Sequence, residues 1–489
     1  MDGTDQAVEH FDVLVIGAGI SGIDAGRHLT ERHPDKSFAL LERKESFGGT
    51  WHTHRFPGIR SDSDLYTFGF SWKPWKGAEI GTAEEILSYL GEAIEEAGLE
   101  DKIRYGVHVS SASWDSARAL WLLDVVDGGV ARQLSCGFLW FCGGYFDHDK
   151  GYQPDWPGME TFDGPIVHPQ HWPEDLDYAG KRVVVIGSGA TAATLIPALA
   201  GTAAHVTMLQ RSPTYFYPRP KSDEFNDILR ELDLPDAQFH DIMRRKMLHM
   251  VKTMTTRSKE EPEVLAREFV MGARAYLGRD FDVKTHFTPS YRPWQQRVAA
   301  IPDGDLSQAI RRGEASVVTD EIARFVPGGI ELRSGEVLEA DIVVSATGLN
   351  LVALGGIALE VDGLAVNPAE CVTQRGVMLS GVPNLGVVVG YLRSSWTVRA
   401  DLGSAVLCRL FDHMAARQAR MVVPEYREAE GGLRPWIDPE NFNAGYIMRA
   451  HAVMPKQGAA EPWVMSQDYF ADREMLPMVD FDDGSLVFR

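Results

Sequence analysis

Two glycine-rich loops, each directly after a short apolar run, constrain the fold of this chain more than any other feature. The first run, FDVLVI at 11–16, is followed by GAGISG, whose glycines are Gly17, Gly19 and Gly22. These positions permit a tight turn, the close approach of backbone to a pyrophosphate, and close packing of helix on strand. The start of the helix then offers unpaired amides to phosphates. The pattern predicts a β–α–β dinucleotide-binding unit.

A second apolar run, FALL at 38–41, ends at Glu42. A carboxylate at this place accepts hydrogen bonds from the hydroxyls of a free ribose. Thr82 and Glu85 form a capping-box pattern within a predicted helix over 77–99. Strand-like runs at 107–109, 120–126 and 138–142 predict an antiparallel insertion that returns to the first sheet.

The segment over 48–62, GGTWHTHRFPGIRSD, is dense in glycine, aromatic and charged residues. We expect it to be irregular, without helix, and to lie on the ligand side of the sheet. Asp62 is its main candidate for chemistry, with an ordinary loop aspartate as the equally weighted alternative. His52 and His54 have no third ligand at a suitable spacing, so they are interpreted as surface or packing residues and no metal site is predicted.

The second glycine loop, GSGATA, follows RVVVI at 182–186 and again predicts a nucleotide-binding unit. Its next strand, HVTML at 205–209, leads to Arg211 and Ser212 where the first unit has Glu42. These residues suit a 2′-phosphate, so the second ligand is predicted to be NADPH rather than NADH, unless Arg211 is only a solvated surface residue. One unit thus suits a cofactor with a free ribose, and the other suits a cofactor with a 2′-phosphate. This combination indicates FAD and NADPH in one enzyme.

A third apolar strand, within EADIVVSATGLN at 339–350, is expected to return the chain to the first domain and to bring backbone close to the flavin. The residues predicted to contact FAD are Gly17, Gly19, Gly22, Glu42, Gly49, Thr50, Trp51, Asp62, Thr347 and Gly348. The residues predicted to contact NADPH are Gly187, Ser188, Gly189, Ala190, Thr191, Arg211, Ser212 and Arg297.

These patterns predict an α/β protein with two Rossmann-like domains. The FAD-binding domain is assigned to 1–145 and 341–489, a connector to 146–180, the NADP-binding domain to 181–216 and 291–340, and a helical insert to 217–290. The insert carries Met243, Met247, Met250 and Met254 at helical spacing. This spacing predicts core or interdomain packing, and the alternative is that the methionines border a substrate channel. The segment over 287–305 is expected to be irregular.

Composition narrows the class of protein. The formal charge of −21 argues against binding of nucleic acid, which requires a basic face. Four cysteines without paired spacing indicate a reduced, cytoplasmic setting. The first ten residues lack the features of a signal peptide, and no apolar stretch is long enough to span a bilayer. The insert also has a basic side, so contact with a membrane surface stays an alternative. The sequence does not indicate an oligomeric state.

Between the two loops lies FDGPIVHPQHWP over 162–173. Its three prolines exclude a regular helix or a central strand, so an ordered connector is expected. It joins the two predicted domains, which is a natural place for a hinge. We interpret Phe162, Gly164, His168 and Trp172 as positional residues of this hinge.

Taken together, these motifs resemble the flavin-dependent Baeyer–Villiger monooxygenases, most closely the subgroup of the ethionamide-activating monooxygenase. The resemblance rests on the connector pattern, on the pattern of Gly49, Trp51, Phe56-Pro57-Gly58 and Asp62, and on the two glycine loops that flank the connector. It extends over nearly the whole chain, including MLQRSPTY and SATGLN.

The resemblance implies that NADPH reduces FAD, and that oxygen then forms a flavin C4a-peroxide that inserts one oxygen next to a ketone carbonyl, giving an ester or lactone. Thioethers can be oxygenated at sulfur instead. By position in the family, Arg297 stabilises the developing negative charge and Asp62 pairs with it. The chain departs from many members at Gln296, where they have a lysine that helps to bind the 2′-phosphate, so the strength of the NADPH preference stays open.

Two other functions remain as alternatives, a flavin N- or S-oxygenase without carbon insertion and a non-catalytic flavin-binding redox sensor. A flavin disulfide reductase needs a cysteine pair, and a hydrolase needs a Gly-x-Ser-x-Gly elbow outside the cofactor loops. The sequence has neither.

Overall fold

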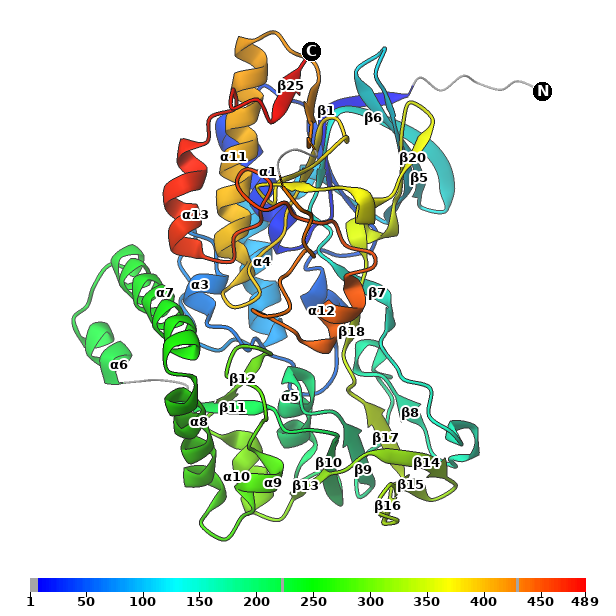
Figure 1. Ribbon diagram of the computed structural model, residues 1–489, viewed down its shortest axis with the longest axis vertical. Coiled ribbons are helices and arrows are strands. Elements are labelled where there is room, and N and C mark those ends of the chain that lie inside the picture. Colours follow the sequence, from blue (N-terminus) through cyan, green and yellow to red (C-terminus); the bar gives the residue numbers. More distant parts are fainter. Residues whose placement is uncertain (1–7, 221–223, 428–430) are drawn as a thin grey trace.

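The computed structural model describes residues 8–220, 224–427 and 431–489, so most of the segment that argued against a signal peptide lies outside the described residues. Figure 1 shows a larger sheet-based unit above, a smaller one below, and an arm of helices at one side. The α/β fold with two nucleotide-binding units, predicted from the glycine loops, is confirmed. No helix among the described residues is long and apolar enough to cross a membrane.

The first unit is built on a nine-stranded sheet in the order β20-β19-β4-β5-β6-β1-β2-β3, with β23 also paired to β6. Its centre is parallel, because β1 pairs in parallel with both β2 and β6, whereas β4, β5 and β6 form the predicted antiparallel insertion. The strands are β1 (Glu9–Ile16), β2 (Phe38–Glu42), β3 (Ile103–Tyr105), β4 (Val107–Asp115), β5 (Leu120–Asp127), β6 (Val130–Phe141), β19 (Ala358–Val361), β20 (Leu364–Val366) and β23 (Leu385–Val387).

Helices α1 and α11 pack side by side against this sheet (Figure 1). The helix predicted from the capping box is α4, in which Thr82 accepts from the amide of Glu85 and the Glu85 side chain accepts in return. The helices of this unit are α1 (Ile20–Arg32), α2 (Thr50–Thr53), α3 (Leu65–Phe68), α4 (Ala83–Glu96), α11 (Trp396–Ala416), α12 (Gly445–Ala450) and α13 (Tyr469–Met475).

The second unit is a five-stranded parallel sheet in the order β13-β10-β9-β17-β8. Between β13 and β17 the chain forms a separate antiparallel sheet in the order β14-β15-β16. Its elements are β8 (Ile166–Val167), β9 (Arg182–Ile186), α5 (Ala190–Leu199), β10 (His205–Gln210), α10 (Asp305–Arg311), β13 (Ala315–Thr319), β14 (Ile322–Val326), β15 (Gly329–Leu332), β16 (Val337–Glu339) and β17 (Ile342–Ser345).

Two expectations about this unit were wrong. The strand within 339–350 was expected in the first domain, but β17 pairs with β9 and β8 in the second sheet, and the chain crosses back only after it. A buried apolar strand pairs equally well in either sheet, so its sequence does not select one. The segment over 287–305 was expected to be irregular, but its end forms β12 (Val298–Pro302), which pairs in parallel with β11 (Tyr215–Arg219).

The predicted insert is helical and lies between β11 and β12. Its helices are α6 (Glu224–Glu231), α7 (Asp236–Glu260), α8 (Pro262–Leu277) and α9 (Val283–His286). Met243 and Met247 are fully buried on α7 and join the hydrophobic core of the first unit. Met250 packs against the same core, whereas Met254 packs against the cluster around Tyr215 and Phe269, so the stripe serves packing, as predicted.

The remaining strands make two-stranded contacts, among which β7 and β18 join the connector to the chain after β17. They are β7 (Phe146–Gly151), β18 (Leu349–Leu351), β21 (Thr373–Gln374), β22 (Met378–Leu379), β24 (Val422–Pro424) and β25 (Leu486–Phe488).

Candidate active site and cofactor loops

The two glycine loops have the shape that a bound dinucleotide requires. Gly17 has a φ of 98°, and a Cβ at Gly22 would collide with the carbonyl oxygen of Gly17, so the helix can approach the strand only without that atom. Gly19 and Gly189 cap α1 and α5 and have no side chains. A Cβ at Gly189 would meet no described atom within 4 Å, which leaves space before the helix N-terminus for phosphates.

Glu42 lies where the ribose acceptor was predicted, at the end of β2. Its Oε2 accepts from the amide of Ala18 in the glycine loop at 2.9 Å, and its Oε1 accepts from the amide of Lys44 at 2.9 Å. Each carboxylate oxygen can accept more than one hydrogen bond, so Glu42 can hold the loop and still accept from a ribose hydroxyl. Contact of Glu42 with ribose stays a prediction.

The expectation of no helix over 48–62 was wrong for one turn. Gly48 and Gly49 have φ values of 109° and 54°, and they place the chain so that Thr50–Thr53 closes a single helical turn. The turn ends at His54, which is extended. A Cβ at Gly19 would lie 3.6 Å from the Cα of Gly49, so the start of this turn is adjacent to the first glycine loop.

Asp62 and Arg297 meet across the two units, 235 residues apart in the sequence. Nη1 of Arg297 donates to Oδ2 of Asp62 at 3.2 Å, and 39% of the Arg297 side chain and 28% of the Asp62 side chain are exposed. Attraction to Asp62 is the main cause that raises the pKa of Arg297, and Tyr446 and Tyr145 add to it. Arg297 is therefore a permanent cation beside an open surface.

The second loop also lies as predicted. Gly187 has a φ of 126°, and the hydroxyl of Ser188 lies 2.9 Å from that of Thr214. Arg211 and Ser212 are exposed directly after β10, at the same place in this unit that Glu42 holds in the first. An exposed guanidinium at the carboxyl end of this strand is available to a 2′-phosphate, and this contact stays a prediction.

Comparison with known proteins places this geometry in a family. One family model, for NAD(P)-binding Rossmann-like domains, matches residues 15–76, and another, for flavin-binding monooxygenase-like proteins, matches residues 82–259. The chain is 44% identical to MymA of Mycobacterium tuberculosis over 487 residues, which cover 98% of both proteins. It is 44% identical to the FAD-containing monooxygenase EthA of Mycolicibacterium smegmatis over 482 residues, which cover 98% of this chain and 97% of EthA. The chain belongs to the FAD-containing monooxygenases.

The fold of this monooxygenase matches that of a steroid monooxygenase solved with NADP bound. The TM-score is 0.78, the sequence identity is 20%, and the match covers 98% of this chain and 99% of the other. At this identity the likeness shows the fold alone, which is that of the Baeyer–Villiger monooxygenases. The predicted family and the predicted FAD cofactor are confirmed.

The connector of this monooxygenase is held by contacts within itself and to the second unit. Nε2 of His168 donates to the carbonyl oxygen of Gly348 at 3.1 Å, and its Nδ1 accepts from the amide of Gln170 at 3.2 Å. Phe162 is buried against Phe325 in the core below the second sheet. These contacts are those of a positional segment, and β8 within it is an edge strand, as its prolines require.

Thr347 and Gly348 lie at the end of β17, beside the second glycine loop, rather than in the first sheet where they were expected. Thr347 donates to the carbonyl oxygen of Tyr152 at 2.5 Å, and a Cβ at Gly187 would collide with the carbonyl oxygen of Ala346. Their predicted contact with FAD stays a prediction.

Sequence reasoning missed two tyrosines beside Arg297, Tyr145 and Tyr446, which add to the rise in its pKa. Tyr145 is buried, and its ring packs edge-on against Trp396 at 4.9 Å and Trp436 at 5.9 Å between centroids. Trp396 in turn donates to the hydroxyl of Ser21 in the first glycine loop at 2.7 Å. The sequence held one signal for Tyr145, the glycine pair Gly143-Gly144 directly before it. Such a pair after a parallel strand often precedes a residue at the edge of the sheet where ligands bind.

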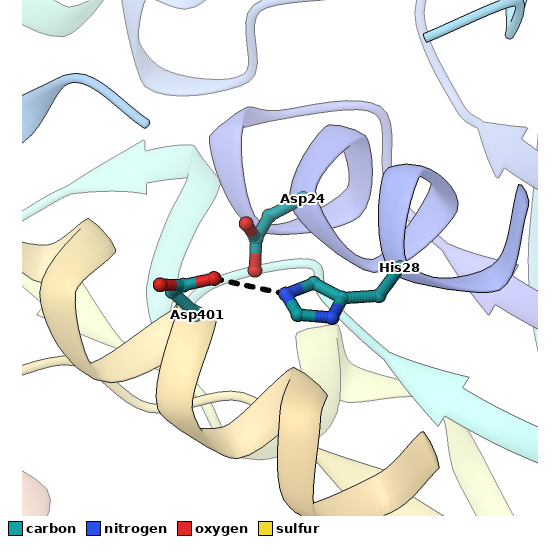
Figure 2. A group of neighbouring side chains, drawn as sticks. All are labelled: Asp24, His28 and Asp401. Atoms are coloured by element: carbon teal, nitrogen blue, oxygen red, sulfur yellow. Dashed lines mark hydrogen bonds and ion pairs between the residues drawn. The ribbon is translucent and has the colours of Figure 1, made fainter. Parts of the chain in front are cut away.

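Three titratable side chains, of which Asp24 and His28 are buried and Asp401 is partly buried, form a trio between α1 and α11 (Figure 2). Their ligand-type atoms are all within 4.8 Å of one another. Nε2 of His28 bonds to Oδ1 of Asp401 at 2.9 Å, and Oδ2 of Asp24 accepts from Ser404 at 2.9 Å. Burial and the nearby charge of Asp401 raise the pKa of Asp24 to about 7. These bonds hold the trio within the fold of the first unit.

Proposed function

We propose that this protein is a Baeyer–Villiger monooxygenase that uses NADPH and O2 to insert one oxygen atom next to a ketone carbonyl. The product is an ester or lactone, and thioethers are oxygenated to sulfoxides in parallel. The observation that carries the proposal is the Asp62–Arg297 pair, which joins the two nucleotide-binding units at a partly exposed place.

The glycine loops suit both cofactors, because their glycines carry no side chains and the first amides of the following helices are free to donate to phosphates. Gly17, Gly19, Gly22 and Glu42 would hold FAD, which when bound supplies the electron transfer and the activation of oxygen. The second loop, together with Arg211 and Ser212, would hold NADPH. A steroid monooxygenase with this fold has been solved with NADP bound, which supports the assignment.

Arg297 has the properties that the oxygen insertion needs. Negative charge develops on the carbonyl oxygen of a ketone under attack, and a preorganised cation stabilises it. A guanidinium does this without giving up a proton, so it does not quench an anionic oxidant. Asp62 orients the guanidinium and holds its pKa high.

The surroundings of Arg297 favour an apolar ketone. Tyr145, Trp396 and Trp436 form an aromatic group beside it, and Phe442 and Ile447 lie in the same buried cluster. Such side chains favour hydrocarbon substituents over charged ones.

The test is product analysis by the purified protein. It is incubated with NADPH, O2 and either an aliphatic ketone or an alkyl aryl thioether, and products are quantified against NADPH consumed. The proposal predicts ester in proportion to NADPH. Sulfoxide without ester would indicate an S-oxygenase, and a single reduction of the flavin without turnover would indicate a redox sensor.

A further inference from the structure

Helix α7 of the insert reaches the first unit at the short helix α3. Arg244 is half-buried on α7, and its Nη1 lies 3.0 Å from the carbonyl oxygen of Tyr66, 3.3 Å from that of Thr67 and 2.9 Å from that of Gly69. All three acceptor residues are buried. One guanidinium therefore donates to three carbonyl oxygens of buried residues.

Helix α3 depends on these outside donors, because the last carbonyls of a helix have no partner within it. The amide of Gly69 bonds to the carbonyl of Leu65 at 2.8 Å, and the hydroxyl of Thr397 donates to the carbonyl of Phe68 at 2.5 Å. The carbonyls between them are those that face Arg244. A buried carbonyl left without a donor destabilises the fold around it, so loss of the Arg244 side chain weakens the closure of α3.

The other end of the same segment carries the site. Asp64 caps α3 by accepting from the amide of Thr67 at 2.8 Å, and Asp62 stands two residues before it. Ser61 braces the turn between them, since its Oγ accepts from the amide of Ser63 at 3.0 Å and donates to the carbonyl of Ser63 at 2.7 Å. Any shift of α3 is thereby passed to Asp62.

Two arginines thus hold the two ends of the segment over 62–69. Arg297, just before β12, pairs with Asp62, and Arg244, on α7, closes the carbonyl end. Both arginines come from the part of the chain between β11 and β17, whereas the segment belongs to the first unit.

We propose that Arg244 is a positioning residue of the monooxygenase reaction, which sets the place at which Asp62 meets Arg297 by closing the carbonyl end of α3. The role of the pair itself rests on the proposed function. Arg244 touches neither member of that pair in its hydrogen bonds, so it acts through the backbone of α3.

The test compares Arg244→Ala with Arg245→Ala in the FAD-loaded enzyme. Arg245 is the next residue on α7, its side chain is 78% exposed, and its ion pair runs along the helix to Asp241 at 2.8 Å. Both variants lose one positive charge from the same helix. The measurements are amide hydrogen exchange over 62–70, and the rate at which each enzyme molecule releases hydrogen peroxide with NADPH and O2 in the absence of organic substrate.

We expect Arg244→Ala to speed exchange over 62–70 by about tenfold or more and to raise peroxide release by about twofold or more, while NADPH still bleaches the flavin. Arg245→Ala should match the wild type in both. Exchange and peroxide release at wild-type levels in Arg244→Ala would overturn the proposal, as would an equal effect of Arg245→Ala.

Should Arg244→Ala not fold, Arg244→Lys keeps the charge with poorer geometry, and unchanged exchange in that variant overturns the proposal. Neither readout needs a ketone, so failure of the wild type to form ester would reject the proposed function and leave this comparison intact.

Discussion

Arg297 and Asp62 show at the scale of single residues how two separate parts of the chain make one chemical feature. The guanidinium is partly exposed, yet its pKa is raised because Asp62 lies 3.2 Å away. Arg297→Ala should leave flavin reduction by NADPH intact and lower ester formation about 100- to 1000-fold, because the charge that develops on the carbonyl oxygen loses its donor. Stopped-flow absorbance and product analysis measure the two steps. Arg297→Lys is the control, since it keeps the charge without the planar fork, and ester formation by Arg297→Ala at the wild-type rate would contradict the assignment.

The choice of nicotinamide cofactor is predicted to depend on Arg211, since the family resemblance implies a lysine where this chain has Gln296. Arg211→Ala should raise the KM for NADPH about tenfold to hundredfold and leave the KM for NADH nearly unchanged, because only NADPH carries the 2′-phosphate. Steady-state kinetics with both cofactors measures the ratio. Arg182→Ala is a suitable control, as Arg182 is bonded to Glu339 and Asp341 at the opposite end of β9. An unchanged ratio would show that Arg211 does not read the phosphate.

The connector is the clearest case at the scale of an element. Burial lowers the pKa of His168, so the ring is neutral near pH 7 and serves as one donor and one acceptor between Gly348 and Gln170. His168→Ala should change kcat and the KM for NADPH together, by roughly three- to tenfold, because these bonds set the connector that joins the units. His171, three residues further on, is exposed, and its ring bonds to the carbonyl of Asp149, so His171→Ala should have little effect. Normal flavin reduction and normal coupling in His168→Ala would remove the positional role.

At the scale of the whole molecule, the trio of Asp24, His28 and Asp401 between α1 and α11 is expected to make stability depend on pH. The folded protein holds a proton on Asp24 up to about pH 7, whereas the unfolded chain releases it near pH 4. The hydrogen bond with Asp401 also raises the pKa of His28, against the effect of burial. Both groups bind protons more tightly in the folded state, so the stability that they contribute falls as the pH rises. For Asp24 this contribution is fully present below about pH 4 and is lost as the pH rises through about 7.

This linkage can be isolated with Asp24→Asn, which cannot take up the proton. The stability of the wild type relative to Asp24→Asn should fall between pH 5 and 7, with a slope of at most about 1.4 kcal/mol per pH unit, and then level off by pH 8. Urea unfolding of both proteins at each pH measures it. Ser404→Ala, which removes the bond to Asp24 but no titratable group, is the control. A difference that is flat from pH 5 to 8 would mean that Asp24 does not carry the proton.

The sequence by itself determined the local features: the two glycine loops, the capped helix α4, the methionine stripe and the irregular character of the connector. Each depends on residues close together in the chain, where backbone sterics and periodicity act directly. The pairing of Asp62 with Arg297 also followed from the sequence, but through family resemblance, because no local rule joins residues 235 positions apart. Only the tertiary structure decided that β17 belongs to the second sheet, that Tyr145 lies beside Arg297, and that Arg244 closes α3. These are choices among partners of similar chemistry, and only the packing of the whole chain settles which partners meet.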